Sequence, residues 1–274
     1  PAVVTDEGTL AADDVVLAPG AHAVRVPAWE PALTLHTAAD ARRLRGALTP
    51  GARLVVIGAG WIGAEVAGVA AAAGHEVTVV EAGLTPLSAA LGDRVGDLTT
   101  PWYHEAGVEL VTAALVTAVR PDGVDLADGR TIPADVVLAA VGARPSTGWL
   151  ADALPLGRGG AVQVGHRYAV LGPALADALA EIPGLWAVGD AATRWSPRHG
   201  TVPGGHWDGA LRGPKALVGH LLGRPAPPPD DDPAPYVFST QLGHDLALFG
   251  IPQPHDEVLL RGDPAAGGWS AVWF

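Results

Sequence analysis

The chain has 274 residues, of which 49% are hydrophobic and 17% charged, a composition typical of a globular protein with one large core or two to three domains. Its formal net charge of −12 and pI near 5.1 argue against a nucleic-acid surface, because binding to the phosphate backbone of a nucleic acid needs a basic stripe. No apolar run approaches the roughly 18 residues of a membrane span, so we expect a soluble, cytoplasmic protein.

Cysteine is absent, so these residues form no disulfide, no thiolate nucleophile and no cysteine-ligated cluster. No two histidines have the HxxxH or HExxH spacing that places two ligands on one helix face, and we expect no metal site. The sequence begins with Pro1 and stops within an alternating apolar run, GGWSAVWF. Both ends favour a fragment of a longer protein.

The first part of the chain predicts alternating strands and helices. Residues 2–18 contain short apolar strands around a DEG turn, and residues 40–49 have alanine, leucine and arginine at helical spacing before a Pro-Gly stop. Residues 54–57 form a continuous apolar run, as expected of a strand buried on both faces of a parallel sheet. An alanine-rich helix over residues 62–73 and a strand over residues 77–80 complete a βαβ unit.

The remainder predicts short strands and one longer helix. Residues 85–107 indicate a helical region broken near Pro101, and the segments VELV, VTAV and GVDL a meander of strands. Further strands are expected at AVQV and LWAV, and a helix with a kink at Pro214 over residues 206–223. The run RPAPPPDDDPAP, residues 224–235, predicts a stiff linker before a last β-rich segment.

The strongest chemical signal is GAGWIG at residues 58–63, a GxGxxG pattern between the predicted strand and helix. Gly58 permits the tight turn, Gly60 lets a pyrophosphate approach the backbone, and Gly63 allows close packing of the helix on the strand. The helix N-terminus offers free N–H groups and a positive dipole end to phosphates. We therefore predict a dinucleotide site, with Ile62 in the same turn among its cofactor-binding residues.

Glu81 ends the second strand of this unit, about 20 residues after the turn, where dinucleotide sites have an acidic residue. Its carboxylate would accept hydrogen bonds from the adenosine ribose hydroxyls and repel a 2′-phosphate. Ala82 and Gly83 supply no arginine to compensate, so NADH is preferred over NADPH. The alternative is a βαβ turn that binds nothing.

A second candidate is GLWAVGDAA, in which a predicted buried strand ends in Gly189 and Asp190. The carboxylate would lie at the carboxyl end of a sheet, the edge at which open α/β folds bind ligands. An ordinary strand-ending aspartate in a turn is the alternative.

The motifs GAGWIGAEVA, VVEAG, LAAVGARP, LWAVGDAA and HW occur in this order. With them the sequence resembles the FAD and NAD(P)H two-dinucleotide-domain oxidoreductases, and among these the ferredoxin, rubredoxin and putidaredoxin reductase branch. The resemblance implies an α/β fold with two Rossmann-like dinucleotide-binding domains, the FAD part incomplete, and a truncated α+β C-terminal domain. It implies the end of a first FAD segment (1–30), an NAD domain (31–147), a second FAD segment (148–226) and a linker with the C-terminal domain (227–274).

The resemblance also implies roles for single residues. Glu65 would be the catalytic acidic residue near the nicotinamide, and Asp190 would hold the FAD ribityl chain beside Gly189. His206 and Trp207 match a motif at a helix start that points at the flavin pyrimidine ring. The other implied cofactor-binding positions are Ala18, Gly20 and Gly142.

Three positions depart from the branch: Pro19, Gly205 and Thr240 replace its usual Thr, Glu and Asp. These changes affect the expected polarity of the flavin site more than the fold. The N-terminal GxGxxG for FAD and the lysine near the flavin are missing, which predicts weak FAD binding, or none, by these residues alone.

In this family an FAD domain is interrupted by an inserted NAD domain of similar fold, so the chain passes from the first domain to the second and back. This arrangement would explain why one strand sequence occurs twice. The sequence DVVLAPG at residues 14–20 returns as DVVLAAVG at residues 135–142. We expect each copy to close one nucleotide-binding domain before the chain crosses to the other.

We therefore expect an FAD-dependent oxidoreductase that passes electrons from NADH to a small ferredoxin-like iron–sulfur protein, as a monomer or homodimer that binds neither nucleic acid nor membrane. Such an acidic partner favours a basic docking patch, for which Arg194, Arg198, Arg212 and Lys215 are candidates if they converge in space. The alternatives are an NADH oxidase, a nitrite-reductase-type flavin module or a disulfide reductase. From a different class, a non-catalytic NADH-binding redox sensor or an inactive fragment stays open.

Overall fold

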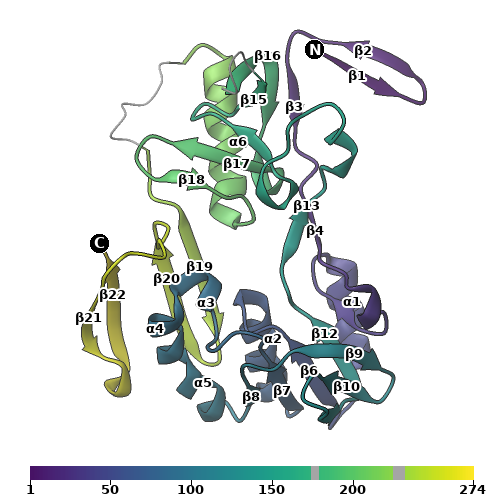
Figure 1. Cartoon of the computed structure of the whole chain (residues 1–274), viewed down its shortest axis with the longest axis vertical. Helices are drawn as coiled ribbons and strands as arrows, with labels where there is room; N and C mark the ends of the chain where they lie inside the picture. Colours follow the sequence, from purple (N-terminus) through teal and green to yellow (C-terminus); the bar gives the residue numbers. More distant parts are fainter. Residues whose placement is uncertain (174–178, 225–231) are drawn as a thin grey trace. The chain divides into compact units, whose positions relative to one another are not determined.

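The computed structural model describes residues 1–173, 179–224 and 232–274, which form two compact units (Figure 1). The first unit consists of residues 1–22, 143–237 and 248–251, and the second of residues 23–142, 238–247 and 252–274. Most of the predicted linker, residues 225–231, lies outside the described residues. The four segments inferred from the family resemblance stay a prediction.

The second unit is built on a five-stranded sheet in which all neighbouring strands are parallel. The strand order is β5 (Leu33–Thr34), β12 (Val136–Ala139), β6 (Arg53–Ile57), β7 (Glu76–Val80) and β8 (Glu109–Val111). Helix α2 (Trp61–Ala72) connects β6 to β7. The predicted βαβ unit is therefore confirmed, and with it the α/β character of the chain.

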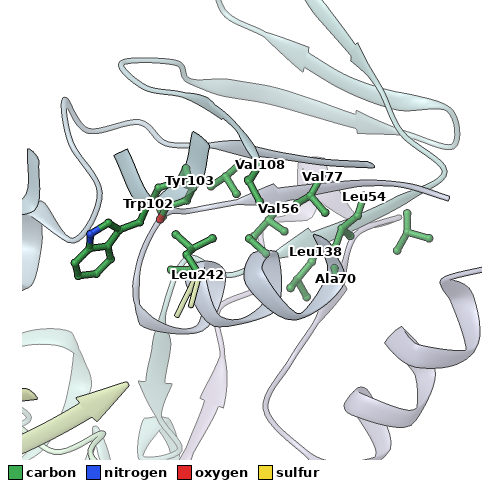
Figure 2. Close-up of a cluster of buried hydrophobic side chains, with 14 of the residues drawn as sticks. Leu54, Val56, Ala70, Val77, Trp102, Tyr103, Val108, Leu138 and Leu242 are labelled. Carbon is green, nitrogen blue, oxygen red and sulfur yellow. The ribbon is translucent and has the colours of Figure 1, made fainter. Parts of the chain in front are cut away.

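Alternate residues of β6 face two different layers, as the period of a strand requires. Leu54 and Val56 share a core cluster with α2, and Figure 2 shows both among the buried side chains of this cluster. Val55 and Ile57 pack on the opposite face, in a cluster with the antiparallel sheet of β9 (Val116–Arg120), β10 (Gly123–Leu126) and β11 (Thr131–Pro133). Both faces of β6 are covered, which explains its unbroken apolar run.

Helix α1 (Ala38–Ala47) confirms the helix predicted before the Pro-Gly stop. It begins with a capping box: the Asp40 N–H donates to the Thr37 hydroxyl over 3.1 Å, and the Thr37 N–H donates to the Asp40 carboxylate over 2.9 Å. The Thr37 hydroxyl also donates to the Asp40 carboxylate over 2.8 Å, and this bond, followed by the one from the Thr37 N–H, holds the pKa of Asp40 below its usual value.

Two expectations for residues 85–111 were wrong in detail. The helical region consists of α3 (Ser88–Leu91), α4 (Asp93–Gly96), the 3-10 turn η2 (Asp97–Thr99) and α5 (Thr100–Glu105). The break falls at Gly92, with φ at +74°, whereas Pro101 lies in the first turn of α5, where its missing N–H costs no helical bond. The segment VELV contains β8, which pairs in parallel with β7 and does not belong to the meander.

The first unit contains a six-stranded mixed sheet. Its strand order is β18 (Gly200–Val202), β17 (Ala192–Ser196), β14 (Val162–Val164), β15 (Ala169–Pro173), β16 (Leu179–Ala187) and β3 (Val15–Leu17). Helix α6 (Trp207–Leu221) continues through Pro214, at which a kink was predicted. The strands predicted at AVQV and LWAV are confirmed as β14 and the end of β16.

The two DVVLA copies occupy equivalent positions in the two units. Each strand, β3 or β12, is preceded by an aspartate that holds the neighbouring parallel strand: Asp14 accepts from Trp186 Nε1 over 2.7 Å, and Asp135 accepts from the Arg53 backbone N–H over 2.9 Å. The following strands, β4 (Ala21–Ala23) and β13 (Ala143–Pro145), pair with each other. The first copy is only partly buried, with Val16 45% exposed, because β3 is the edge strand of its sheet in the described residues.

The predicted β-rich C-terminal segment is confirmed. It forms the hairpins β19 (Tyr236–Gln241) with β20 (His244–Phe249), and β21 (Val258–Asp263) with β22 (Gly268–Trp273). The remaining elements are the hairpin β1 (Ala2–Thr5) with β2 (Gly8–Ala11) and the 3-10 turns η1 (Pro27–Trp29), η3 (Gly148–Leu150), η4 (Arg158–Gly160), η6 (Gly189–Ala191) and η8 (Pro264–Ala266). None of the helices that the structure describes is long and apolar enough to span a bilayer.

Replacement of Leu138 by alanine tests the packing of the second unit. Leu138 is fully buried on β12, between β5 and β6, so Leu138→Ala should lower the free energy of unfolding by about 2–5 kcal/mol. The control Val69→Ala removes a side chain that is 72% exposed on α2 and should change it by about 0.5 kcal/mol or less. Urea denaturation followed by circular dichroism measures both, and equal losses would contradict the placement of Leu138.

The ion pair of Asp135 with Arg53 predicts a pH-dependent contribution to stability. Hydrogen bonds from the Arg53 side chain and backbone lower the pKa of Asp135 to about 2 from an ordinary 3.8. The stabilisation is therefore fully present above pH 3.8 and is lost as the pH falls toward 2. Thermal denaturation should show wild type more stable than Asp135→Asn at neutral pH, with the difference shrinking over this range; a constant difference would disprove the assignment.

Candidate functional site

The glycine turn between β6 and α2 is shaped by contacts that exclude side chains. A Cβ at Gly58 would lie 2.7 Å from the Ala140 carbonyl oxygen, and the residue has φ of +104°, a conformation that favours glycine. A Cβ at Gly63 would lie only 2.0 Å from the Gly58 carbonyl oxygen. These distances agree with the roles predicted for both residues in the turn and in the packing of α2.

Gly60 differs from its two neighbours in the motif. It is the N-cap residue of α2 with φ of −81°, which any residue adopts, and a Cβ there would meet nothing within 4 Å. The fold itself therefore does not require glycine at this position. The space beside it adjoins the first N–H groups of α2, and the partly exposed side chain of Ile62 lies in the same first turn.

Glu81, at the carboxyl end of β7, is held by two backbone groups. Its Oε2 accepts a hydrogen bond from the Ala59 N–H and its Oε1 one from the Gly83 N–H, both over 2.7 Å. An ionised carboxylate has about four acceptor positions, so both oxygens keep capacity for hydroxyl donors. The structure thus brings the predicted acidic residue to the predicted glycine turn.

Tyr103, on α5, is a neighbour of this site that the sequence did not reveal. Its hydroxyl is buried and has no hydrogen-bond partner among the residues that the structure describes. Burial raises the pKa of Tyr103, and the negative charge of Glu81 raises it further. The phenol therefore stays neutral, and no pattern around YHE in the sequence distinguishes it from an ordinary core tyrosine.

Glu65 lies on α2, one helical turn after the start of the helix, and its side chain is hydrogen-bonded to the C-terminal hairpin. Ser239 Oγ donates to Glu65 Oε1 over 2.5 Å, and Gln241 Nε2 donates to Ser239 Oγ over 3.1 Å. Sequence reasoning missed Ser239 and Gln241, because 174 residues separate Ser239 from Glu65 and no motif marks the contact.

Gly142 lies beyond the end of β12, near the same edge of the sheet as the glycine turn. The Ala140 N–H donates to the Ile57 carbonyl oxygen over 2.8 Å, which continues the pairing of β12 with β6 up to the turn. Gly142 has φ of +99°, and its carbonyl oxygen accepts from the Val24 N–H over 3.0 Å. The structure therefore places Gly142 shortly after the strand that borders the turn.

In the first unit, the predicted residues after β3 and β16 lie at neighbouring strand ends. The two strands are parallel, and the Val188 N–H donates to the Leu17 carbonyl oxygen over 3.1 Å. Ala18 and Gly20 follow β3, and Gly189 and Asp190 follow β16. Four of the predicted flavin-site positions thus share one edge of the sheet.

The loop before α6 reaches the same edge. The Gly205 N–H donates to Asp190 Oδ1 over 3.2 Å, and a Cβ at Gly204 would lie 2.7 Å from the Gly189 carbonyl oxygen. His206 is the N-cap residue of α6, followed by the exposed Trp207. Burial lowers the pKa of His206 against the opposing charge of Asp190, so the imidazole is neutral at pH 7.

The departures from the family pattern have different physical settings. Gly205 has φ of +100°, so the glutamate usual in the branch would be strained on this backbone. Thr240 is exposed and donates to Asp245 Oδ1 over 2.6 Å. Nothing in the structure explains Pro19.

Two of the four predicted docking cations are paired with carboxylates of their own unit. Arg194 forms an ion pair with Asp232 at 2.9 Å, in which both side chains are less than one fifth exposed, and Arg212 pairs with Asp208 at 2.6 Å. Their charges are therefore largely compensated within the chain. In the parts of the chain that the structure covers, no three His, Asp or Glu side chains gather as a metal site.

Comparisons with known proteins agree with this arrangement. The family model of pyridine nucleotide-disulphide oxidoreductases matches residues 2–209. A probable ferredoxin reductase of Castellaniella defragrans is 31% identical over 249 residues, which cover 86% of this chain and 56% of the relative. The ferredoxin–NAD(+) reductase component of the biphenyl dioxygenase system of Paraburkholderia xenovorans is 33% identical over 272 residues, covering 94% of this chain and 62% of the relative.

Among solved structures, the covalent putidaredoxin reductase–putidaredoxin complex has a TM-score of 0.86 at 27% identity, covering 99% of this chain and 66% of that chain. The chain therefore spans less than two thirds of the two curated relatives. The matched residues include the glycine turn, Glu81 and the Asp190 edge. This chain belongs to the pyridine nucleotide-disulphide oxidoreductase family.

Proposed function

We propose that the protein is an NADH-dependent FAD flavoprotein reductase that passes electrons to a small ferredoxin-type iron–sulfur protein. The observation that carries the proposal is the carboxylate of Glu81, fixed by the Ala59 and Gly83 N–H groups beside the glycine turn. A carboxylate held in this way accepts hydrogen bonds from both hydroxyls of an adenosine ribose and repels a 2′-phosphate. NADH is therefore preferred over NADPH.

The start of α2 binds the pyrophosphate in this proposal. The first N–H groups of a helix have no intrahelical acceptor and carry the positive end of its dipole. Because Gly60 has no packing role, its missing side chain is best explained by a ligand that approaches the backbone there. Glu65, in the next turn, contacts the nicotinamide end of the nucleotide.

The first unit contributes part of an FAD site. Asp190 is a strand-end carboxylate suited to the hydroxyls of a ribityl chain, and the Gly205 N–H fixes its Oδ1. The start of α6, next to the neutral His206, offers a positive dipole end to the flavin ring. FAD, when bound, accepts two electrons from NADH and releases them one at a time.

The electron acceptor is proposed from the relatives. One relative is named as a ferredoxin–NAD(+) reductase component and one solved neighbour is a reductase in complex with putidaredoxin. A ferredoxin-type partner follows for this protein by similarity. A cytoplasmic location and a monomeric or homodimeric state belong to the same proposal.

Two glycine variants separate nucleotide binding from folding. Gly60→Ala places a methyl group in open space and should cost about 1 kcal/mol or less as an N-cap change, but should weaken NADH binding at least about tenfold. Gly63→Ala collides with the backbone of Gly58 and should destabilise the second unit by about 1–3 kcal/mol. Calorimetric titration with NADH and thermal denaturation measure the two effects, and unchanged NADH affinity in Gly60→Ala would refute the pyrophosphate site.

Glu81→Ala should lower the affinity for NADH about tenfold and that for NADPH far less, because only NADH has the 2′-hydroxyl that the carboxylate accepts. Glu76→Ala is the matched control, since Glu76 is an exposed carboxylate at the other end of β7. Titration of each variant with both nucleotides gives the ratio of the two dissociation constants. A wild type that binds NADPH as tightly as NADH would exclude this role of Glu81.

A further inference from the structure

The turn between β19 and β20 is seated on helix α2. A Cβ at Gly68 would lie 2.7 Å from the Leu242 nitrogen and 3.0 Å from its Cα, so the turn fits only because residue 68 has no side chain. Leu242 is 5% exposed and belongs to the core cluster of the second unit, where Figure 2 shows it near Trp102 and Tyr103. His244 stacks on Trp102 with ring centroids 4.4 Å apart. Residues of this hairpin are therefore a fixed part of the nucleotide-binding unit.

The buried face of β19 is polar, which is unusual for a strand packed on a core. Phe238 and Thr240 are exposed, whereas the alternate residues Ser239 and Gln241 are only 3% and 1% exposed. Burial of a hydroxyl and an amide costs free energy unless hydrogen bonds replace those made to water. Apolar residues at these two positions would anchor the hairpin at lower cost.

The two polar side chains form a directed chain of hydrogen bonds that ends on Glu65. The Gln241 amide donates to Ser239 Oγ, and Ser239 Oγ donates to Glu65 Oε1. A hydroxyl that accepts one hydrogen bond is a stronger donor in the next, so the chain is polarised toward the carboxylate. Gln241 Oε1 is buried without a hydrogen-bond partner in the described parts of the chain, which costs free energy, while the amide nitrogen makes one hydrogen bond to Ser239.

This series of hydrogen bonds leaves one oxygen of the Glu65 carboxylate available. Oε1 is committed to Ser239, while no hydrogen bond to Oε2 is present within the described ranges. Glu81, the other carboxylate of the site, is held by different groups, the N–H of Ala59 and of Gly83. The two carboxylates are therefore oriented by separate sets of donors.

We propose that Ser239, supported by Gln241, is a positioning residue that orients Glu65 toward the nicotinamide end of the bound nucleotide. The proposal rests on the proposed function, in which Glu65 contacts that end. The carboxamide of nicotinamide carries two N–H donors, which suits a carboxylate oxygen that is already oriented by its partner. The C-terminal hairpin thereby sets the geometry of a site whose glycine turn lies far earlier in the sequence.

The test compares the binding of NADH with that of ADP-ribose, which keeps the adenosine and pyrophosphate but lacks the nicotinamide. Calorimetric titration of Ser239→Ala should show NADH bound about tenfold more weakly and ADP-ribose bound as in wild type. Gln241→Leu, which keeps the volume of the side chain, should weaken NADH binding about threefold and leave ADP-ribose unchanged. The control Thr99→Val removes another fully buried hydroxyl of the same unit, bonded to Gly96, and should change neither affinity.

A double-mutant cycle with Glu65→Gln tests whether Ser239 acts through Glu65. In the Glu65→Gln background, Ser239→Ala should cause no further loss of NADH affinity, because interacting residues give non-additive effects. Additive losses, an unchanged NADH affinity in Ser239→Ala, or equal losses for NADH and ADP-ribose would each overturn the positioning role. A wild-type protein that binds neither ligand would instead refute the proposed function itself.

Discussion

The backbone of helix α2 packs directly against the backbone of the glycine turn. A Cβ at Gly63 would lie 2.0 Å from the Gly58 carbonyl oxygen. The residues of α2 that face the sheet are small, and Ala64, Ala67 and Ala70 are all buried. Packing between surfaces without large side chains lets the helix lie close to the strands. The positions of the helix N-terminus, of the Ala59 N–H that reaches Glu81, and of Glu65 all follow from this contact.

The two units use the same strand motif in the same way. An aspartate precedes β3 in one unit and β12 in the other, and each accepts hydrogen bonds from the adjacent parallel strand. A glycine with positive φ then ends each motif, Gly20 in one case and Gly142 in the other. The strands that follow, β4 and β13, pair with each other. Repetition of the sequence thus reflects repetition of a local task, which is to anchor a strand and then redirect the chain.

Most of the second unit could be predicted from the sequence because its signals are local. A strand buried on both faces, a glycine turn and an alanine-rich helix each leave a pattern within about a dozen residues, and the acid at Glu81 follows at a fixed spacing. The break at Gly92 was misplaced to Pro101 because a proline is tolerated in the first turn of a helix and disruptive only later. Strand β8 was assigned to the meander because periodicity does not reveal which strands pair.

The missed parts of the candidate site depend on contacts between distant segments. Ser239 and Gln241 alternate with exposed residues in an ordinary strand pattern, and only the fold brings them to Glu65. The unpartnered hydroxyl of Tyr103 is visible only once its burial is known. Likewise, the sequence alone makes Arg194 and Arg212 candidates for a docking patch, and only the structure shows that each is paired with a carboxylate.

The packing of the β19–β20 turn on Gly68 has a consequence for folding during synthesis. Residues 23–142 of the second unit are synthesised before residues 143–235 of the other unit, and the hairpin follows only after these. At about 5–20 residues per second, this interval lasts roughly 5 to 20 seconds. During that time α2 and the ring of Trp102 are without the hairpin that later packs on them. A newly made chain must therefore keep this apolar surface from aggregation until its own late segment arrives to close it.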